Sequence, residues 1–266
     1  MYLSAIDEAT LIAATGPALQ RAGVGSVKIL AYDHNWDRPE YPLYILGNDS
    51  SSPWVAGSAF HCYAGDVSAQ SKVHELYPER EIHMTECSGG DWAPEFWSTL
   101  VWNVQQLYVG STINWGQSIN HWNLALDSNG MYDVAPSRTL RSVPSLTRST
   151  GSLVSDGPTN NGCLNCRGVV RVNSASSVDY NVEYWGMGHF SRFFAFPTRR
   201  IATTLAGDAL SCITTTAFAN AGNQTVQLVV LNVCTTSQAV TVNYGAKYSL
   251  TIQVPQGLMT LVWSSA

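Results

Sequence analysis

The sequence predicts an α/β part followed by an all-β part, and two patterns support this prediction. Helical and strand-like apolar patterns alternate through residues 5–124, and the strand-like runs end in polar residues. From residue 198 onward, short β-like runs follow one another at regular spacing, with turn residues between them. The first pattern is typical of parallel strands joined by helices, and the second of an antiparallel β-sandwich.

The α/β part begins with helical spacing over residues 5–22, interrupted at Gly16-Pro17 and ended by Gly23. The same patterns then predict, in order, a strand at 27–32, a helix at 41–46, a strand at 55–61, a helix at 66–76, a strand at 81–85, a helix at 94–108 and a strand at 117–124. Four such strands with polar carboxyl ends are half of a (β/α)8 TIM barrel, in which the strand ends converge on one face.

The remaining chain contains one more predicted helix, at 180–194, and then the β runs. These are expected at 213–218, 226–232, 239–244, 248–254 and 259–263. We therefore place a partial barrel at 1–194 and a β-sandwich at 195–266. Residues 131–150 lack periodicity and are rich in Ser, Thr and Pro, so we expect a disordered insertion there; a translated intron is one hypothesis for its origin.

Composition limits the possible function. The chain is 45% hydrophobic and only 12% charged, which suits a large core under a polar, uncharged surface. A net charge of −5 argues against nucleic-acid binding, and no apolar run is long enough for a membrane span. Sequons at Asn48 and Asn223 fit an extracellular glycoprotein, whose signal peptide would lie upstream of Met1.

Six cysteines are too few for a disulfide scaffold. Cys163 and Cys166 form one C-x-x-C, and no second ligand pair follows at zinc spacing, so a local disulfide or two free thiols is expected rather than a metal. Cys62 and Cys87 each follow a predicted strand end and are expected near each other, bonded or not. We expect neither a metal nor an organic cofactor.

Glu86 is the main candidate for chemistry. It stands where the strand at 81–85 meets the glycine-rich turn Cys87-Ser88-Gly89-Gly90, so a rigid strand would present an accessible carboxylate. Such a group suits nucleophilic or acid–base work on a sugar or ester. The alternative is a surface glutamate paired with a nearby cation. No G-x-S-x-G, P-loop or dinucleotide fingerprint occurs, which argues against those enzyme classes.

Several strand-end motifs together resemble glycoside hydrolase family 30. They are LAYDHNWDRPEYP (30–42), GSAFHCYAG (57–65), MTECSGG (84–90), HWNLALD (121–127), CRGVV (166–170) and YWGMGHFSRF (184–193). The resemblance implies a retaining β-glycosidase with a (β/α)8 barrel fused to a β-sandwich. It also implies that the four strands of this chain are strands five to eight, in the second half of the barrel.

The resemblance implies a role for each strand end. Glu86 matches the catalytic nucleophile, and His61 and Tyr63 match residues that line the sugar subsite. Asp33, His34 and Asn35 match the end of strand five. Trp122 matches an aromatic residue of the sugar platform, and Trp115 or Trp36 are further candidates for stacking on sugar rings.

One departure concerns the acid/base glutamate, which the resemblance places at the end of strand four. No residue of this chain matches it, and Asp33 is the remaining strand-end acid, at a position that does not correspond. We therefore expect an incomplete barrel in which the strand at 27–32 has an open edge. The expected substrate is a β-linked glucan or glucoside, with β-1,6-glucan favoured by the DHNWDRPEYP run. Alternatives are a glucosylceramidase-like β-glucosidase and a non-catalytic carbohydrate-binding remnant.

Overall fold

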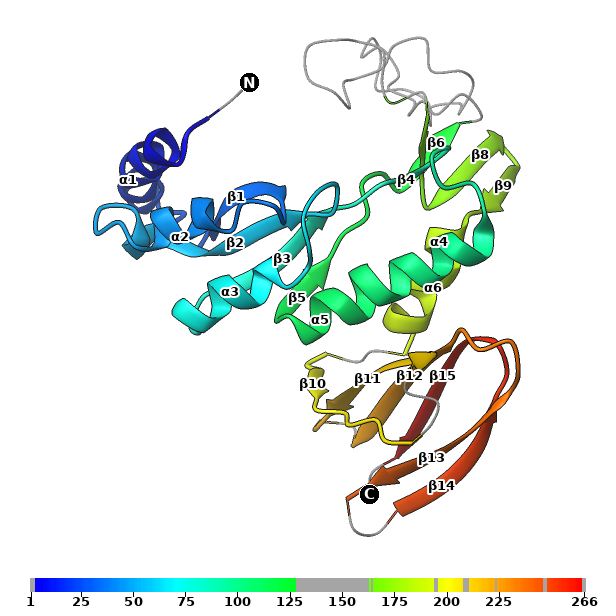
Figure 1. Ribbon diagram of the computed structural model, residues 1–266. Coiled ribbons are helices and arrows are strands. Elements are labelled where there is room, and N and C mark those ends of the chain that lie inside the picture. Colours follow the sequence, from blue (N-terminus) through cyan, green and yellow to red (C-terminus); the bar gives the residue numbers. More distant parts are fainter. Residues whose placement is uncertain are drawn as a thin grey trace. The chain divides into compact units, whose positions relative to one another are not determined.

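The chain divides into two compact units, each with its own sheets (Figure 1). The computed structural model describes residues 3–127, 163, 165–193, 196–207, 211–222, 224–245 and 248–264. One unit comprises Met1–Ser88 with Gly110–Trp122, and the other Gly89–Val109 with Asn123–Ala266. The insertion expected at 131–150 lies outside the described residues. Of the helices within them, none has the length and apolar character needed to cross a membrane.

The first unit is built on a four-stranded parallel sheet. Its strands, in spatial order, are β1 (Ile29–Asn35), β2 (Val55–His61), β3 (Glu81–Glu86) and β5 (Gly116–Ile119). Helix α2 (Glu40–Leu46) lies between β1 and β2 in the chain, and α3 (Ala69–Leu76) lies between β2 and β3. Every pairing in the sheet is parallel. The prediction of parallel strands in chain order is therefore confirmed.

Helix α1 (Ala5–Arg21) begins at the Ser4 cap, whose hydroxyl accepts a hydrogen bond from the Asp7 amide, and it continues through Pro17. The predicted interruption at Gly16-Pro17 is therefore wrong. Gly16 packs directly on Trp54 of the short helix η1 (Ser52–Trp54), where an added Cβ would lie 2.2 Å from the indole ring. Tertiary packing of this kind outweighs the local preference of proline against a helix interior.

The outer edge of the sheet is strand β1, which starts two residues later than predicted and extends through Asn35. Helices α1 and α2 pack beside it. The Glu8 side chain of α1 accepts a hydrogen bond of 2.9 Å from the Tyr32 backbone amide. An α1 carboxylate thus satisfies one amide of the strand that we expected to be open.

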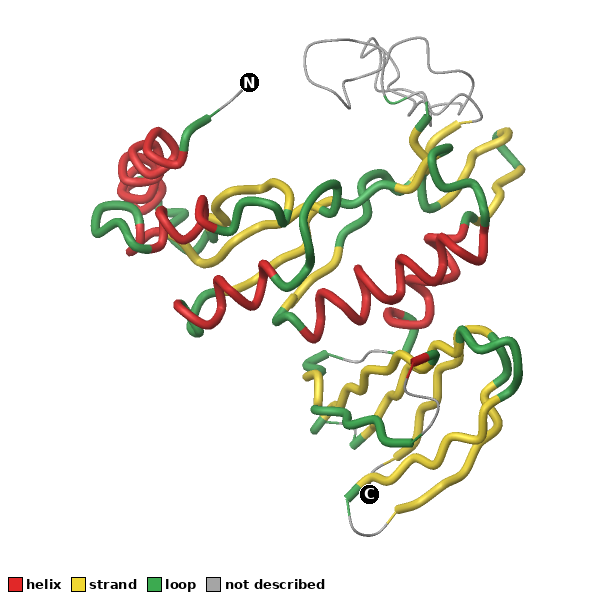
Figure 2. The backbone as a smooth tube through the Cα atoms, viewed as in Figure 1, coloured by secondary structure: helices red, strands yellow, loops and turns green. Residues whose placement is uncertain are grey.

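The strand predicted at 117–124 ends instead at Ile119. Asn123 adopts a left-handed backbone with φ of +75°, and its side-chain oxygen accepts a hydrogen bond from the Ala125 amide, so the chain turns before β6 (Ala125–Asp127). The helix predicted at 94–108 is α4 (Phe96–Trp102), continued by the π-helix η2 (Asn103–Gly110) and α5 (Ser111–Ile113), as Figure 2 shows.

The second unit contains two small sheets that the sequence patterns did not predict. Strand β4 (Gly89–Gly90) pairs with β7 (Cys166–Arg167), while β6 and β9 (Ser177–Tyr180) flank β8 (Val170–Ser174). Helix α6 (Val182–Ser191) follows, within the predicted 180–194. An ion pair joins β7 to α6: Arg167 donates hydrogen bonds to both carboxylate oxygens of Glu183, which is 1% exposed. Arg167 also donates to the backbone carbonyls of Gly90 and Ala93.

The β-sandwich of this unit has a four-stranded antiparallel sheet and a hairpin. The sheet consists of β10 (Arg199–Ile201), β11 (Ile213–Asn220), β12 (Thr225–Asn232) and β15 (Gly257–Ser264). The hairpin pairs β13 (Gln238–Tyr244) with β14 (Tyr248–Val254). Alternate apolar residues form the core, with Ile213, Leu228, Val230 and Val254 buried. The antiparallel arrangement predicted from residue 198 onward is confirmed.

Candidate active site

The carboxyl ends of β1, β2 and β3 lie side by side in the first unit. The strand register pairs Asn35 with His61, and His61 with Glu86, so three polar residues form one row across the sheet. In this row His61 is buried, at 8% exposure, and Asn35 and Glu86 are partly exposed. The sequence-predicted strand ends are therefore neighbours in the structure, as parallel pairing requires.

This register depends on two β-bulges, one in β1 and one in β3, the strands on either side of β2. Residue Asp33 is extra between Tyr32 and His34 relative to β2, and Thr85 is extra between Met84 and Glu86. Tyr32 and Asp33 both have left-handed backbones, with φ of +83° and +50°. Bulges re-aim side chains, and non-glycine residues at positive φ are uncommon, so the distortion marks this end of the sheet as a specialised region.

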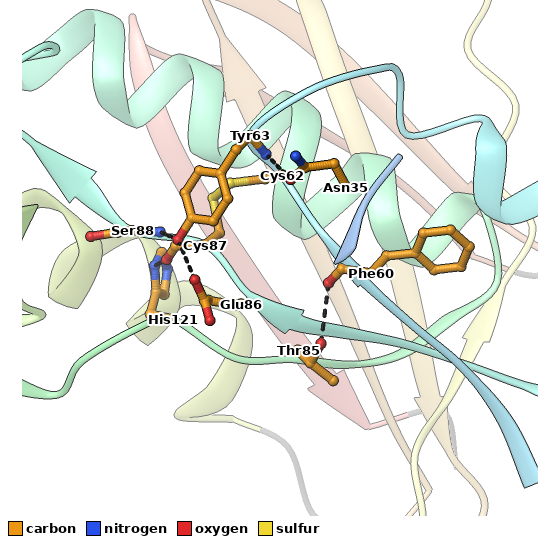
Figure 3. Close-up of a disulfide and its surroundings, with 9 residues drawn as sticks. All are labelled: Asn35, Phe60, Cys62, Tyr63, Thr85, Glu86, Cys87, Ser88 and His121. Atoms are coloured by element: carbon orange, nitrogen blue, oxygen red, sulfur yellow. Dashed lines mark hydrogen bonds between the residues drawn. A yellow bond between two sulfur atoms is a disulfide. The ribbon is translucent and has the colours of Figure 1, made fainter. Parts of the chain in front are cut away.

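The two bulged residues bond to each other. Thr85 Oγ1 donates to Asp33 Oδ1 over 2.7 Å, and the same carboxylate oxygen lies 3.0 Å from His61 Nε2. Thr85 Oγ1 also lies 3.3 Å from the Phe60 carbonyl oxygen. Figure 3 marks this hydrogen bond with a dashed line. The hydrogen bond with His61, and after it the one from Thr85, lowers the pKa of Asp33 despite partial burial. Asp33 is thereby held as a carboxylate.

Glu86 is oriented by a tyrosine. Tyr63 Oη donates to Glu86 Oε1 over 2.9 Å and accepts a hydrogen bond of 3.0 Å from the Ser88 amide (Figure 3). The Tyr63 amide in turn donates to Asn35 Oδ1 over 3.1 Å. Partial burial, and then the negative charge of Glu86, raise the pKa of Tyr63, so its hydroxyl keeps its proton. In the described part of the chain, Glu86 has no lysine or arginine as an ion-pair partner, unlike the surface-glutamate alternative.

A disulfide joins the two strand ends that carry these groups. Cys62 and Cys87 are bonded, with Cα atoms 5.4 Å apart. The Cys87 carbonyl accepts hydrogen bonds from His121 Nδ1 over 3.1 Å and from the Trp122 amide over 3.0 Å. The loop after β5 is thereby fastened next to Glu86. Cys163–Cys166 and Cys212–Cys234 are also disulfides, the first being one of the two alternatives that the C-x-x-C left open.

The structure brings most of the predicted site residues together. Asp33 contacts His61, Asn35 contacts Tyr63, and Tyr63 contacts Glu86. The His34 ring lies 6.1 Å from the His61 ring, edge to face. Trp122 is placed beside this group through its backbone bond to Cys87.

The two further stacking candidates are wrong. Trp36 is only 3% exposed, so no ring can stack on it from solvent. Trp115 precedes β5 and stacks on His74 of α3, with ring centroids 3.7 Å apart. It therefore lies at the amino end of the strand, whereas Glu86 lies at a carboxyl end.

Sequence reasoning missed Thr85, Ser88 and His121 as parts of this region. Each is adjacent to a residue that was singled out, within the motifs at 84–90 and 121–127. The role of Thr85 depends on the β-bulge, which cannot be predicted from the residue pattern. Within the described ranges, no three His, Cys, Asp or Glu side chains gather in a way that could hold a metal ion.

Comparisons with known proteins agree with the motifs. Residues 198–261 match the profile of the Glycosyl hydrolase family 30 beta sandwich domain. The chain is 30% identical over 213 residues to Endo-1,6-beta-D-glucanase BGN16.3 of Trichoderma harzianum, covering 78% of this chain and 35% of that protein. It is 33% identical over 198 residues to Endo-1,6-beta-D-glucanase of Neurospora crassa, covering 73% of this chain and 35% of that protein.

Solved structures show the same relationship. The endo-beta1,6-glucanase BT3312 is similar over 100% of this chain and 54% of its own, with a TM-score of 0.82 and 26% identity. SrfJ from Salmonella typhimurium shares the fold, with a TM-score of 0.77 at 21% identity, over 98% of this chain and 53% of its own.

These similarities identify the chain as one related to the glycoside hydrolases. The resemblance to family 30 is confirmed, and residues 198–261 carry the β-sandwich domain of that family. The chain spans about a third of the length of the curated relatives that it matches.

Proposed function

We propose that this chain carries the nucleophile half of a retaining β-glycoside hydrolase acting on β-1,6-glucan, with Glu86 as the nucleophile. The supporting observation is the hydrogen bond from Tyr63 Oη to Glu86 Oε1, at a row of strand ends that also holds Asn35 and His61. It orients a partly exposed carboxylate that has a free second oxygen among the contacts described. The relatives reported above are named as β-1,6-glucanases, so we propose that glucan rather than a glucosylceramide.

The proposed reaction has two steps. The Glu86 carboxylate attacks the anomeric carbon, the glycosidic oxygen leaves with a proton, and a glycosyl-enzyme ester remains. Water then attacks the same carbon and gives a proton to the second carboxyl group, and the ester bond to Glu86 breaks with overall retention. In retaining enzymes the second carboxyl group stands about 5–5.5 Å from the nucleophile and supplies the proton. The test below therefore uses a substrate whose leaving group needs little protonation, so that it reports on Glu86.

The neighbouring residues receive proposed roles from their positions. The Asp33 carboxylate, held by His61 and Thr85, accepts hydrogen bonds from sugar hydroxyls, and His34 and Asn35 contact the same ring. Tyr63 holds the nucleophile, and Trp122 supplies an apolar platform for the sugar ring. We further propose that 1–194 is a partial (β/α)8 barrel, strands five to eight, and 195–266 the sandwich domain. Three disulfides and a polymeric substrate suit an extracellular protein.

A non-catalytic carbohydrate binder is the second candidate function. Two carboxylates at the strand ends favour it, because Tyr63 orients Glu86 while His61 and Thr85 hold Asp33. In that case Glu86 and Asp33 would bind sugar hydroxyls as hydrogen-bond acceptors, and no covalent intermediate would form.

The test uses an aryl β-glucoside with an activated leaving group, because such a group departs with little protonation. We expect a burst of released phenol that is lost in Glu86→Gln. Glu81→Gln is the matched control, since Glu81 lies on the same strand but bonds Lys28 and His83. Binding of pustulan, a β-1,6-glucan, without any burst would support the binder and contradict the proposed hydrolase. Release of sugar from glucosylceramide but not from pustulan would contradict the proposed substrate.

A further inference from the structure

The Cys62–Cys87 disulfide lies next to the candidate site residues on two neighbouring strands of the first unit. Cys62 lies between His61 and Tyr63, and Cys87 directly follows Glu86. His61 and Glu86 are the last paired residues of β2 and β3, so the disulfide joins the strands one residue beyond their final hydrogen-bonded row. The bond therefore fixes the distance between the backbone that carries Tyr63 and the backbone that carries Glu86.

The Tyr63 ring is not held by packing alone. It is 47% exposed, and it touches Glu86 and the Ser88 amide through its hydroxyl. An aromatic ring with this exposure keeps its direction only if its backbone is held. Two described contacts hold that backbone: the hydrogen bond that the Tyr63 amide donates to Asn35 Oδ1, and the adjacent disulfide.

The other end of the disulfide is anchored more firmly. Cys87 is 2% exposed, and its carbonyl accepts hydrogen bonds from His121 and from the Trp122 amide. The anchored cysteine thus serves as the fixed point, and Cys62 with Tyr63 is the part that it restrains. Figure 3 shows the Tyr63 hydroxyl directed at Glu86 and at the Ser88 amide.

We propose that the Cys62–Cys87 disulfide is a positioning element that holds the Tyr63 hydroxyl against the Glu86 carboxylate. This proposal rests on the proposed function in assigning the nucleophile to Glu86. It makes the orientation of that carboxylate dependent on the oxidation state of one cysteine pair. Opening the disulfide leaves the sheet paired through His61 and Glu86 but frees Tyr63 to turn toward solvent.

The chain supplies its own matched control. Cys212–Cys234 closes a loop of similar length, with a sequence separation of 22 against 25 and a Cα–Cα distance of 5.2 Å against 5.4 Å, but it lies beside the sandwich strands. Loss of either bond removes a similar restraint on the unfolded chain. A purely structural role therefore predicts similar loss of thermal stability from both, and no special effect on Tyr63.

The experiment compares Cys62→Ser/Cys87→Ser with Cys212→Ser/Cys234→Ser by NMR titration of tyrosine labelled at Cζ. The Tyr63 signal is the one that disappears in Tyr63→Phe. We expect the pKa of Tyr63 to fall toward the ordinary value of 10.0 in the first variant and to stay raised in the second. We also expect glycosyl-enzyme formation to slow about tenfold or more in the first variant only, the scale of one lost hydrogen bond to a charged group. The same Tyr63 titration in both variants would overturn the proposal.

A second experiment covers the case in which the serine variant does not fold, and two combinations of results separate the positioning role from the proposed function. If the serine pair does not fold, the native chain is reduced with dithiothreitol, the opened disulfide is identified by mass spectrometry, and the same titration is recorded. If the unaltered chain forms no glycosyl-enzyme but Tyr63 still responds to the disulfide, the positioning role stands and the proposed function fails. If the chain forms the glycosyl-enzyme and Tyr63 does not respond, the positioning role fails alone.

Discussion

Thr85 donates a hydrogen bond of 2.7 Å to Asp33, and both residues are the extra members of β-bulges in strands that are not adjacent. Strand β2 lies between them, and the Thr85 hydroxyl also reaches the Phe60 carbonyl of that strand. The two distortions therefore support each other across the middle strand. They also shift the register so that Asn35, His61 and Glu86 fall into one row.

The Asp33→Asn variant tests how much the negative charge of Asp33 contributes to the stability of this contact. Asparagine accepts the left-handed backbone at this position, so the change removes charge without adding backbone strain. Because the folded-state pKa of Asp33 is lowered, its carboxylate stabilises the fold above the unfolded-state pKa, and this contribution is lost as pH falls through the folded-state pKa.

We therefore expect Asp33→Asn to be less stable than the unaltered chain at neutral pH, by less than about 1 kcal/mol, because the side chain is 67% exposed and solvent screens the interaction. The difference should vanish in acid. Urea unfolding measured across the acid range checks this, with the exposed Asp49→Asn as the control. A difference that persists at the lowest pH would contradict the electrostatic explanation.

Tyr63→Phe removes the hydroxyl that bonds Glu86 and leaves the ring in place. We expect glycosyl-enzyme formation to slow about 10- to 100-fold, the scale of a hydrogen bond to a charged group, with little change in sugar affinity. Pre-steady-state release of phenol from an activated glucoside measures this. Tyr44→Phe, on the exposed face of α2, is the control. An unchanged rate in Tyr63→Phe would show that Glu86 does not need this donor.

The Arg167–Glu183 pair should contribute to stability in proportion to its burial. Glu183→Gln leaves the Arg167 guanidinium uncompensated beside the Gly90 and Ala93 carbonyls, so we expect a loss of about 3–5 kcal/mol. Lys28→Gln breaks an exposed pair with Glu81 and should cost about 1 kcal/mol or less. Chemical denaturation of both variants measures the two losses in the free energy of unfolding. Equal losses would mean that burial does not determine how much an ion pair stabilises this chain.

Two helical glycines should respond in opposite directions to alanine. Gly16→Ala places a Cβ 2.2 Å from the Trp54 ring and should destabilise the chain by about 1–3 kcal/mol. Gly188→Ala, in α6, meets nothing within 4 Å and should stabilise by about 0.5–1 kcal/mol through the helix preference of alanine. Thermal unfolding distinguishes them, and a stabilising Gly16→Ala would contradict the packing of α1 on Trp54.

The parallel strands were predictable because β1 and β2 contain apolar runs, β3 alternates apolar and polar residues, and helical patterns separate these strands in the chain. Strand β2 was predicted to the residue, and every residue of Val55–His61 except the partly buried Ala56 is buried. The error at Pro17 arose because the preference of proline against a helix interior is a local property, whereas the packing of Trp54 on this helix is a tertiary contact. The error at 120–124 arose because β5 ends at Ile119 and the Asn123 side chain, which accepts a hydrogen bond from the Ala125 amide, then supports a turn before β6.

The candidate site was predictable as a set of strand-end residues, but its hydrogen-bond network was not. Asp33, His61 and Glu86 were recognisable from position and motif, and the disulfide between Cys62 and Cys87 was left open. The bulges at Asp33 and Thr85 could not be predicted, because an extra residue in a short strand leaves the apolar pattern almost unchanged. The partners of Asp33 and Tyr63 depend on those bulges and so emerged only from the structure.

If Glu86 is the nucleophile that we propose, it attacks the anomeric carbon and carries the sugar covalently. The most direct measurement is the intact mass of the chain after incubation with a 2-deoxy-2-fluoro-β-glucoside bearing an activated leaving group, followed by peptide mapping. We predict a covalent gain of one fluorosugar on the peptide that contains Glu86, absent in Glu86→Gln and retained in Glu81→Gln. A label on another carboxylate such as Asp33, or no label on a folded chain that binds the sugar, would contradict the account.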